Sequence, residues 1–205
     1  CGCGAITRAL GEFGADVVAL EGSSLRAEIA ATRCRDLGGV TVVCDSFDAF
    51  ETVERFDVVT LIGVLEYARK YFSVEPGNDP VKATLEKARR MLKPGGVFLL
   101  AIENQLGLKY FAGRPEDHNG VPMYGIEDLY GSVDAVTFGK QELTGLLSTA
   151  GWRHQRWWYP FPDYKFPISI LSEAGVRTSA DMTPLLQNSV VVDPQHGATS
   201  FSLES

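Results

Sequence analysis

The stretch Cys1-Gly2-Cys3-Gly4-Ala5-Ile6-Thr7, followed by Val17-Val18-Ala19-Leu20-Glu21, decides the fold of this chain. A glycine-rich turn leads into a helix, and an apolar strand then ends in a carboxylate. Glycines let the backbone pass close to a ligand because no Cβ stands in the way. The helix start offers unpaired N–H groups, and an acid about twenty residues further on can accept both hydroxyls of a ribose. A lone Gly-x-Gly also fits an ordinary strand-to-helix turn, so the nucleoside-site interpretation depends on the segments downstream.

Helix and strand patterns alternate through the first half of the chain. Short, continuous apolar runs are typical of strands that are buried on both faces of a sheet. The helical segments between them end at glycines, as helices commonly do. This alternation predicts a largely parallel sheet with helices on both faces. We expect helices over 5–13, 23–37 and 81–92, and strands over 16–20, 40–44, 56–62 and 97–102.

The alternation stops after Glu103. Residues 104–137 are rich in Gly, Pro, Asp and aromatic residues and are too long for an ordinary connection, which is typical of a lid or a binding segment. A helix over 138–150 and a strand over 152–159 follow, whereas 183–192 fit a helix and a strand equally well. We expect one domain over 1–160, with an insert at about 104–137, and a C-terminal extension over 161–205.

Composition narrows the class of protein. A chain of 205 residues that is 45% hydrophobic can bury one sizeable core. Its net charge of −7 argues against a nucleic-acid partner held through phosphate contacts. No run of eighteen apolar residues occurs, so we expect no membrane span. The four cysteines and three histidines lack zinc-site spacing, which favours reduced thiols in a cytoplasmic protein and no bound metal.

Five motifs follow one another in a recognisable order. They are the glycine turn, an acid after the second strand, an acid after the third, and the segments Phe56-Asp57-Val58-Val59 and Leu92-Lys93-Pro94-Gly95-Gly96. This series resembles the class I S-adenosylmethionine-dependent methyltransferases over about residues 1–160. The resemblance implies a Rossmann-like, doubly wound α/β fold. Its mostly parallel sheet would have seven strands, the last one antiparallel, with the cofactor at the carboxyl ends of the first strands.

Both ends of the chain look cut by comparison with that family. The chain starts inside the glycine turn, so we expect the first strand of the sheet to lie upstream of Cys1. No convincing antiparallel strand follows 152–159, so we expect the final strand to be missing as well. Because the net stability of a domain is only about 5–15 kcal/mol, a chain without a central strand would not fold cooperatively.

The resemblance also implies a binding site for S-adenosyl-L-methionine. Glu21 would accept hydrogen bonds from the ribose hydroxyls, and Asp45 would accept one from the adenine amino group. Two simpler interpretations stay open: Glu21 as an acid stabilised by the dipole of the next helix, and Asp45 as a helix cap. The remaining residues that the family's pattern places against the cofactor are Gly2, Cys3, Gly4, Gly22, Ser23, Ser46, Phe47, Gly63 and Val64.

Candidate catalytic groups lie in the insert and directly before it. Methyl transfer is an in-line displacement in which positioning supplies much of the rate, but a hydroxyl acceptor also needs a base. We consider Glu103 and Asn104, and then Glu116-Asp117-His118, in which the histidine titrates near neutral pH. His118 also fits a surface histidine bonded to a neighbouring carbonyl or to Asp117, and Glu103 a turn cap. Aromatic residues that fit either an acceptor pocket or plain core are Tyr110, Tyr124, Trp157, Trp158 and Tyr159.

The absence of one motif and a second resemblance narrow the chemical class of the methyl acceptor. No Asn-Pro-Pro-Tyr motif follows the fourth strand; Gly63-Val64-Leu65-Glu66 stands there, which disfavours methylation of nucleic-acid bases. Residues 103–113 and 162–167 resemble bacterial methyltransferase domains found with glycosyltransferases in surface-polysaccharide assembly. We expect a sugar hydroxyl as acceptor, ahead of another small molecule.

Two other functions remain open. A non-catalytic module could retain the fold and bind a nucleoside cofactor. A nicotinamide-dependent oxidoreductase would share the glycine turn and the ribose acid, but it would normally show Gly-x-Gly-x-x-Gly. In this chain Thr7 occupies the position of the last glycine.

Overall fold

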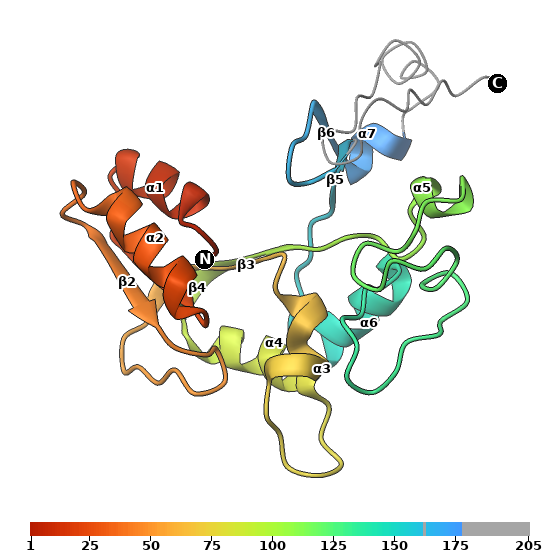
Figure 1. Ribbon diagram of the computed structural model, residues 1–205, viewed down its shortest axis with the longest axis horizontal. Coiled ribbons are helices and arrows are strands. Elements are labelled where there is room, and N and C mark those ends of the chain that lie inside the picture. Colours follow the sequence, from red (N-terminus) through yellow and green to blue (C-terminus); the bar gives the residue numbers. More distant parts are fainter. Residues whose placement is uncertain (162, 178–205) are drawn as a thin grey trace.

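Two parallel strand pairs form the framework of the amino-terminal half (Figure 1). The structure, a computed structural model, describes residues 1–161 and 163–177. The first pair joins β1 (Val17–Glu21) and β2 (Val40–Cys44), and Glu21 lies opposite Cys44 at their carboxyl ends. Helices α1 (Ala5–Glu12) and α2 (Ser24–Cys34) pack on this pair and on one another.

Gly4 sets how closely these two helices approach. It has a φ of +78°, in the left-handed region, and it forms the amino-terminal cap of α1. A Cβ added to Gly4 would lie 2.9 Å from the Cα and Cβ of Ala30 in α2. The second glycine of the turn is therefore required for packing, whatever ligand the turn binds.

The second pair joins β3 (Phe56–Ile62) and β4 (Leu92–Ala101). Between them lie the 3-10 turn η1 (Leu65–Tyr67) and the helices α3 (Ala68–Tyr71) and α4 (Pro80–Arg90). Asp79 caps α4 by accepting a hydrogen bond from Val81 N, with Pro80 at the first helical position. β4 begins five residues earlier than the expected 97, because Leu92 still pairs with Phe56 while the intervening residues form an irregularity in the strand.

The helix and strands after residue 138 differ more from those that the sequence predicts. Helix α6 (Lys140–Thr149) matches the prediction, but the strand expected over 152–159 is β5 (Trp158–Phe161), which starts six residues late. Trp152 instead stacks on Phe98 at 4.5 Å and donates a hydrogen bond to Leu85 O, so its ring is anchored in the core. A further strand that we did not expect, β6 (Ser169–Ser172), pairs antiparallel with β5 and leads into α7 (Glu173–Arg177).

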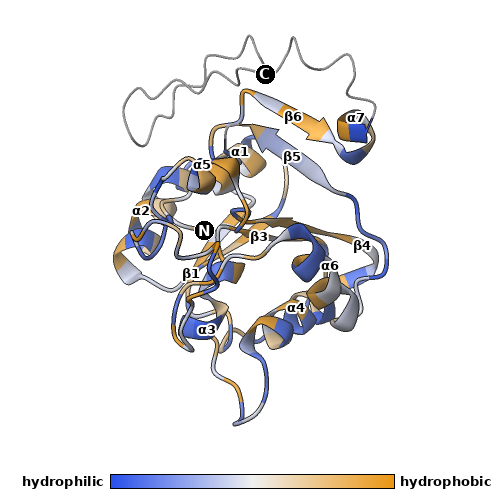
Figure 2. Cartoon of the chain, turned by 90° about the vertical axis from the view of Figure 1, so that its right-hand side faces the viewer, coloured by the Kyte–Doolittle hydropathy of each residue, from blue (hydrophilic) through white to orange (hydrophobic). Residues whose placement is uncertain are grey.

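The main hydrophobic core lies between β4, α4 and α6, and the end of the insert contributes to it. Leu65 and Leu85 are fully buried at its centre. Val136, near the end of the insert, and Phe138, directly after it, are 4% and 3% exposed and belong to the same cluster. In Figure 2 hydrophobic colouring runs along β3 and along β6. Within residues 1–161 and 163–177, no helix has both the length and the apolar character that crossing a membrane demands.

The described strands form three two-stranded sheets rather than one sheet of seven strands. β1 pairs only with β2, and β3 pairs only with β4, within the part of the chain that the structure describes. The loop after β2 joins the two parallel units: Phe47 packs against the core of β3 and α4, and Lys87 Nζ donates to Asp48 O at 2.8 Å. The segment 183–192 lies outside the described residues.

Candidate active site

Glu21 joins the glycine turn to the end of β1. Its Oε2 accepts a hydrogen bond from Gly2 N at 2.7 Å, and its Oε1 accepts from Ser23 N at 3.1 Å and from Arg26 Nε at 2.9 Å. The residue is 6% exposed. Burial raises its pKa, but the hydrogen bonds from the backbone N–H groups of Ser23 and Gly2 oppose burial, and the pKa lies below its usual value. Glu21 is therefore an ionised acceptor that is positioned before any ligand arrives.

The other residues expected at the nucleoside end gather around Glu21. Because β1 and β2 are parallel and in register, Asp45 follows the neighbouring strand and donates its N–H to Glu21 O at 3.1 Å. Asp45 Oδ1 accepts from Ser46 N at 2.8 Å, so this carboxylate also orders its own turn. Gly22 is exposed beside Glu21, Cys3 is exposed in the glycine turn, and Phe47 is partly buried against α4. Their contacts with a cofactor stay a prediction.

Gly63 and Val64, expected at the methionine end, lie at the end of β3. Gly63 has a φ of +64° and donates its N–H to Ala101 O at 2.9 Å, which closes the β3–β4 ladder. A Cβ added to Gly63 would lie 2.8 Å from the hydroxyl oxygen of Tyr164. The end of β3 therefore lies against the turn that joins β5 to β6.

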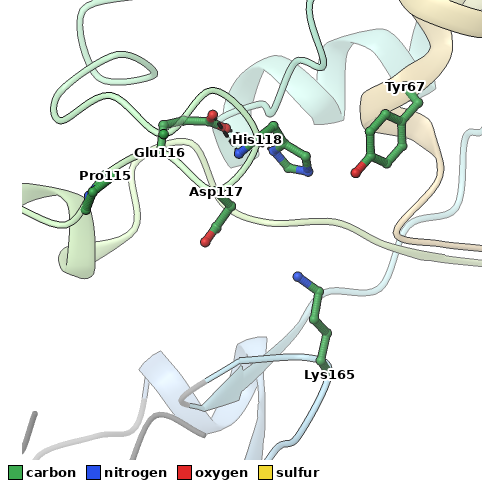
Figure 3. A pocket seen from close by; sticks show the side chains of 7 residues that line it. Tyr67, Pro115, Glu116, Asp117, His118 and Lys165 are labelled. Carbon is green, nitrogen blue, oxygen red and sulfur yellow. Dashed lines mark hydrogen bonds and ion pairs between the residues drawn. The ribbon is translucent and has the colours of Figure 1, made fainter. Parts of the chain in front are cut away.

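A polar pocket of about 400 Å³ lies where the insert faces that turn (Figure 3). Tyr67 reaches it from η1 and Lys165 from the β5–β6 turn, while the remaining lining comes from the insert. Figure 3 shows the imidazole of His118 and the ring of Tyr67 facing one another, with Lys165 pointing up towards Asp117. The lining residues are Tyr67, Pro115, Glu116, Asp117, His118, Gly120 and Lys165.

His118 is held in one orientation. Its Nδ1 lies 3.0 Å from Glu116 Oε1, and Glu116 Oε2 accepts from the backbone N–H groups of His118 and Asn119 at 2.8 and 2.6 Å. Burial lowers the pKa of His118, but the bond to Glu116 and the neighbouring carboxylates outweigh burial and raise it above its usual value. The side chain is 9% exposed and is not bonded to Asp117, which accepts from Lys109 and Tyr110 instead. His118 is thus a buried, oriented imidazole.

Two buried glutamates lie beside that imidazole. Glu103 follows β4, and its Oε1 accepts from Lys165 Nζ at 2.6 Å and from the Tyr164 hydroxyl at 3.3 Å. Glu66 lies in η1 with its Oε1 3.9 Å from His118 Nε2. Burial and the nearby Glu103 charge raise the pKa of Glu66 to about 7. Within the described residues, the Oε2 atoms of both glutamates lack a hydrogen-bond partner.

Not every predicted residue reaches this cluster. Asn104 is exposed, and its Oδ1 accepts from Leu106 N at 3.1 Å, so its side chain orders the start of the insert. The aromatic residues proposed for an acceptor pocket are not among the lining residues; Tyr67 lines it instead. Sequence reasoning also missed Glu66 and Lys165, whereas Glu116 was named as a candidate beside His118. Only Glu66 carried a usable signal, as an acid just past the end of a strand.

Comparison with known proteins identifies the amino-terminal half. The family described as "Methyltransferase domain" matches residues 1–98. Over this stretch, a little less than half of the chain, the sequence is similar to that family. The match and the two parallel pairs confirm the expected Rossmann-like α/β fold of the class I methyltransferase type. No curated protein matches the chain.

Solved structures resemble the methyltransferase domain at low identity. The YcgJ protein of Bacillus subtilis is 17% identical with a TM-score of 0.50, over 78% of this chain and 60% of that one. The N-methyltransferase NodS of Bradyrhizobium japonicum is 15% identical with a TM-score of 0.49, over 73% and 67%. The methyltransferase CcbJ of Streptomyces caelestis is 22% identical with a TM-score of 0.45, over 52% and 41%. The chain thus spans 41% to 67% of the length of these three proteins.

Proposed function

We propose that this chain is part of an S-adenosyl-L-methionine-dependent methyltransferase that methylates a hydroxyl of a sugar or another small molecule. The observation that carries the proposal is the ionised Glu21, fixed beside the glycine turn at the end of β1 in a chain whose residues 1–98 match the methyltransferase domain family. An acid at that place suits the two hydroxyls of a ribose.

The cofactor would lie along the carboxyl ends of the strands. Glu21 would bind the ribose, Asp45 the adenine amino group, and the turn at Gly2 the methionine portion. Ligands of open α/β sheets bind at this edge. Oε1 of Glu21 already accepts two hydrogen bonds, so a ribose hydroxyl that binds there would displace the exposed side chain of Arg26.

The acceptor would enter the pocket beside His118. Glu116 accepts from Nδ1 and so leaves Nε2 as the nitrogen that can take a proton, an arrangement that general bases share. Glu103 and Glu66 add buried acceptors for a hydroxyl proton. The excess of carboxylates favours a neutral or cationic acceptor over a phosphorylated one.

Calorimetry distinguishes this proposal from the two alternatives. We expect S-adenosyl-L-homocysteine to bind and NAD to give no saturable heat; binding of NAD alone would overturn the proposal in favour of an oxidoreductase. Transfer of a labelled methyl group is then measured over a panel of sugars and hydroxylated small molecules. Tight cofactor binding with no transfer to any member, in a protein with an intact pocket, would favour the non-catalytic module.

The variant His118→Gln tests the pocket separately. It keeps a polar side chain of similar reach but removes the titrating nitrogen, so transfer should fall by about 10²–10⁴-fold, the range of general-base contributions. Affinity for S-adenosyl-L-homocysteine should stay unchanged. Unchanged transfer would exclude His118 from catalysis.

A further inference from the structure

Three side chains from separate segments converge at one side of the pocket, next to His118 in its lining. Glu66 comes from the turn after β3, Glu103 from the end of β4, and His118 from the insert. One ligand atom from each lies within 4.8 Å of the other two. Nitrogen and oxygen ligands bond a first-row metal ion at about 2.0–2.2 Å, so small side-chain rotations would bring these atoms into coordinating range.

The two glutamates leave buried oxygens without partners. Their side chains are each 2% exposed, and in each of them Oε2 lacks a hydrogen bond within residues 1–161 and 163–177. A buried carboxylate oxygen without a partner is costly, so such atoms call for a proton or a cation. Lys165 already donates a hydrogen bond to Oε1 of Glu103, whereas Oε2 of Glu103 remains available to bind a cation.

His118 is oriented as metal-bound histidines are. A ligating histidine almost always donates its other ring N–H to a carboxylate or carbonyl, which fixes the tautomer. Glu116 accepts from Nδ1 at 3.0 Å and is itself held by two backbone N–H groups, so the lone pair of Nε2 faces Glu66. This support is built into the insert independently of the two glutamates.

The charge of the cluster also suits a dication. Four carboxylates lie in or next to the pocket: Glu116 and Asp117 line it, and Glu66 and Glu103 lie beside His118. Two ammonium groups, on Lys109 and Lys165, face them. When all four carboxylates are ionised and the imidazole is neutral, an excess of two negative charges remains among these groups.

We propose that Glu66, Glu103 and His118 form a binding site for one divalent first-row transition metal ion. Two carboxylates and one imidazole suit Mn²⁺, Fe²⁺ or Zn²⁺ better than Ca²⁺, which takes six to eight oxygen ligands. The open side of the pocket would leave coordination positions for water or for the acceptor hydroxyl. A cation there would lower the pKa of that hydroxyl, whose proton would then pass to solvent water, because His118 as a metal ligand could not accept it. This catalytic consequence rests on the proposed function, whereas binding of the metal does not.

Mn²⁺ is the probe of choice. It prefers oxygen and imidazole ligands, so the four free cysteines compete for it far less than for Zn²⁺. Chelator-treated protein is titrated with Mn²⁺ by calorimetry, and free Mn²⁺ is followed by electron paramagnetic resonance. We expect one saturable site per chain and a rise in the unfolding midpoint with Mn²⁺, since a ligand that binds only the folded state stabilises it.

Single substitutions test which residues bind the Mn²⁺ ion. Glu66→Gln and His118→Gln should each abolish saturable binding and the thermal shift, and Glu116→Gln should weaken binding about 10–100-fold, as loss of an outer partner does. Glu127→Gln, at an exposed acid of the same insert, should bind as the unchanged protein does. Calcium at equal concentration should not compete.

Two results would overturn the proposal. One is the absence of saturable Mn²⁺ binding by chelator-treated protein that gives a cooperative unfolding transition. The other is binding that survives both Glu66→Gln and His118→Gln, which would place the ion elsewhere. Neither result bears on binding of S-adenosyl-L-homocysteine, so the two proposals fail separately.

Discussion

Glu21 stabilises its own turn with the same two oxygens that are proposed to bind ribose. Removing its side chain would release the N–H groups of Gly2 and Ser23 as well as the ligand. Because hydrogen bonds to a charged group contribute about 1.5–3 kcal/mol, the loss should be large on the scale of cofactor affinity.

We therefore expect Glu21→Ala to weaken binding of S-adenosyl-L-homocysteine by about 1.5–3 kcal/mol. Calorimetry measures the change, with circular dichroism as the check that the variant is folded. Glu28→Ala, at an exposed acid of α2, is the matched control and should bind normally. An unchanged dissociation constant in Glu21→Ala would exclude this residue from the site.

Gly4 provides a test of backbone conformation at the same turn. Gly4→Ala should destabilise the fold by at least about 1–3 kcal/mol, because a non-glycine residue would have to adopt a left-handed φ and its Cβ would meet Ala30 at 2.9 Å. In Gly145→Ala the new Cβ meets nothing within 4 Å inside α6, so that change should stabilise by about 0.5–1 kcal/mol. Urea denaturation measures both, and equal effects would contradict the packing role of Gly4.

Single residues were predictable from sequence where they lie next to a strand end. Glu21, Asp45 and Glu103 each follow an apolar run directly, and parallel strands bring such positions to one edge of a sheet. Glu116 and Lys165 could not be found this way. Their place in the pocket depends on how the insert and the β5–β6 turn fold back, which local patterns do not encode.

At the scale of elements, the insert is more than a cover for the acceptor. Val136, near its end, and Phe138, directly after it, pack in the main core. Gln105, near its start, makes two hydrogen bonds that hold the insert together. Gln105 Nε2 donates to Gly125 O at 2.7 Å, and its Oε1 accepts from Gly139 N at 3.1 Å. Deleting residues 104–137 would therefore disturb folding, so smaller changes are needed to test a lid.

Gln105→Ala should loosen the insert while leaving the β3–β4 pair intact. The change leaves Gly125 O and Gly139 N without their partner, at a cost of about 1–3 kcal/mol. Hydrogen exchange should accelerate within 104–139 and stay unchanged in β3. Gln141→Ala, on the exposed side of α6, serves as the control. If exchange in the insert did not change, Gln105 would not be what holds it.

The bounds of strands with uninterrupted apolar runs were predictable from the sequence, whereas the bounds of strands that contain or adjoin prolines were not. The bounds of β2 and β3 agree with the sequence pattern, since β-branched runs between glycines and charges allow little else. β5 and β6 are flanked or interrupted by Pro160 and Pro167, which a sequence pattern interprets as strand ends. Proline is tolerated in edge strands such as these, because edge N–H groups need no partner.

Over the whole molecule, the β5–β6 hairpin is joined to the rest largely through polar contacts. Lys165 binds Glu103 and Lys140 binds Glu173, while Trp158 and Ile170 are 59% and 56% exposed. A two-stranded hairpin has little stability of its own in water. Its docking therefore depends on the charges in the pocket.

We expect the hairpin to open locally before the molecule unfolds. Amide exchange in 158–161 and 169–172 should be faster than in β3 and β4, and Lys165→Ala should accelerate it further. Lys82→Ala, an exposed change on α4, should have no effect on these amides. If amides of the hairpin exchanged as slowly as those of the β3–β4 pair, the hairpin would not open before the rest of the molecule.

The missing side chain at position 63 has a consequence for these charges. The hydroxyl of Tyr164 occupies the space that a methyl group on Gly63 would fill. A methyl added there would displace Tyr164 and, with it, the adjoining Lys165 that neutralises Glu103. The surroundings of Glu103 thus depend on the absence of a Cβ at Gly63, because the hydroxyl of Tyr164, a hundred residues further along the sequence, lies in that space. An alteration of shape alone, with every ionisable group retained, would disturb the contact of Tyr164 with Glu103, next to the ion pair that Glu103 forms with Lys165.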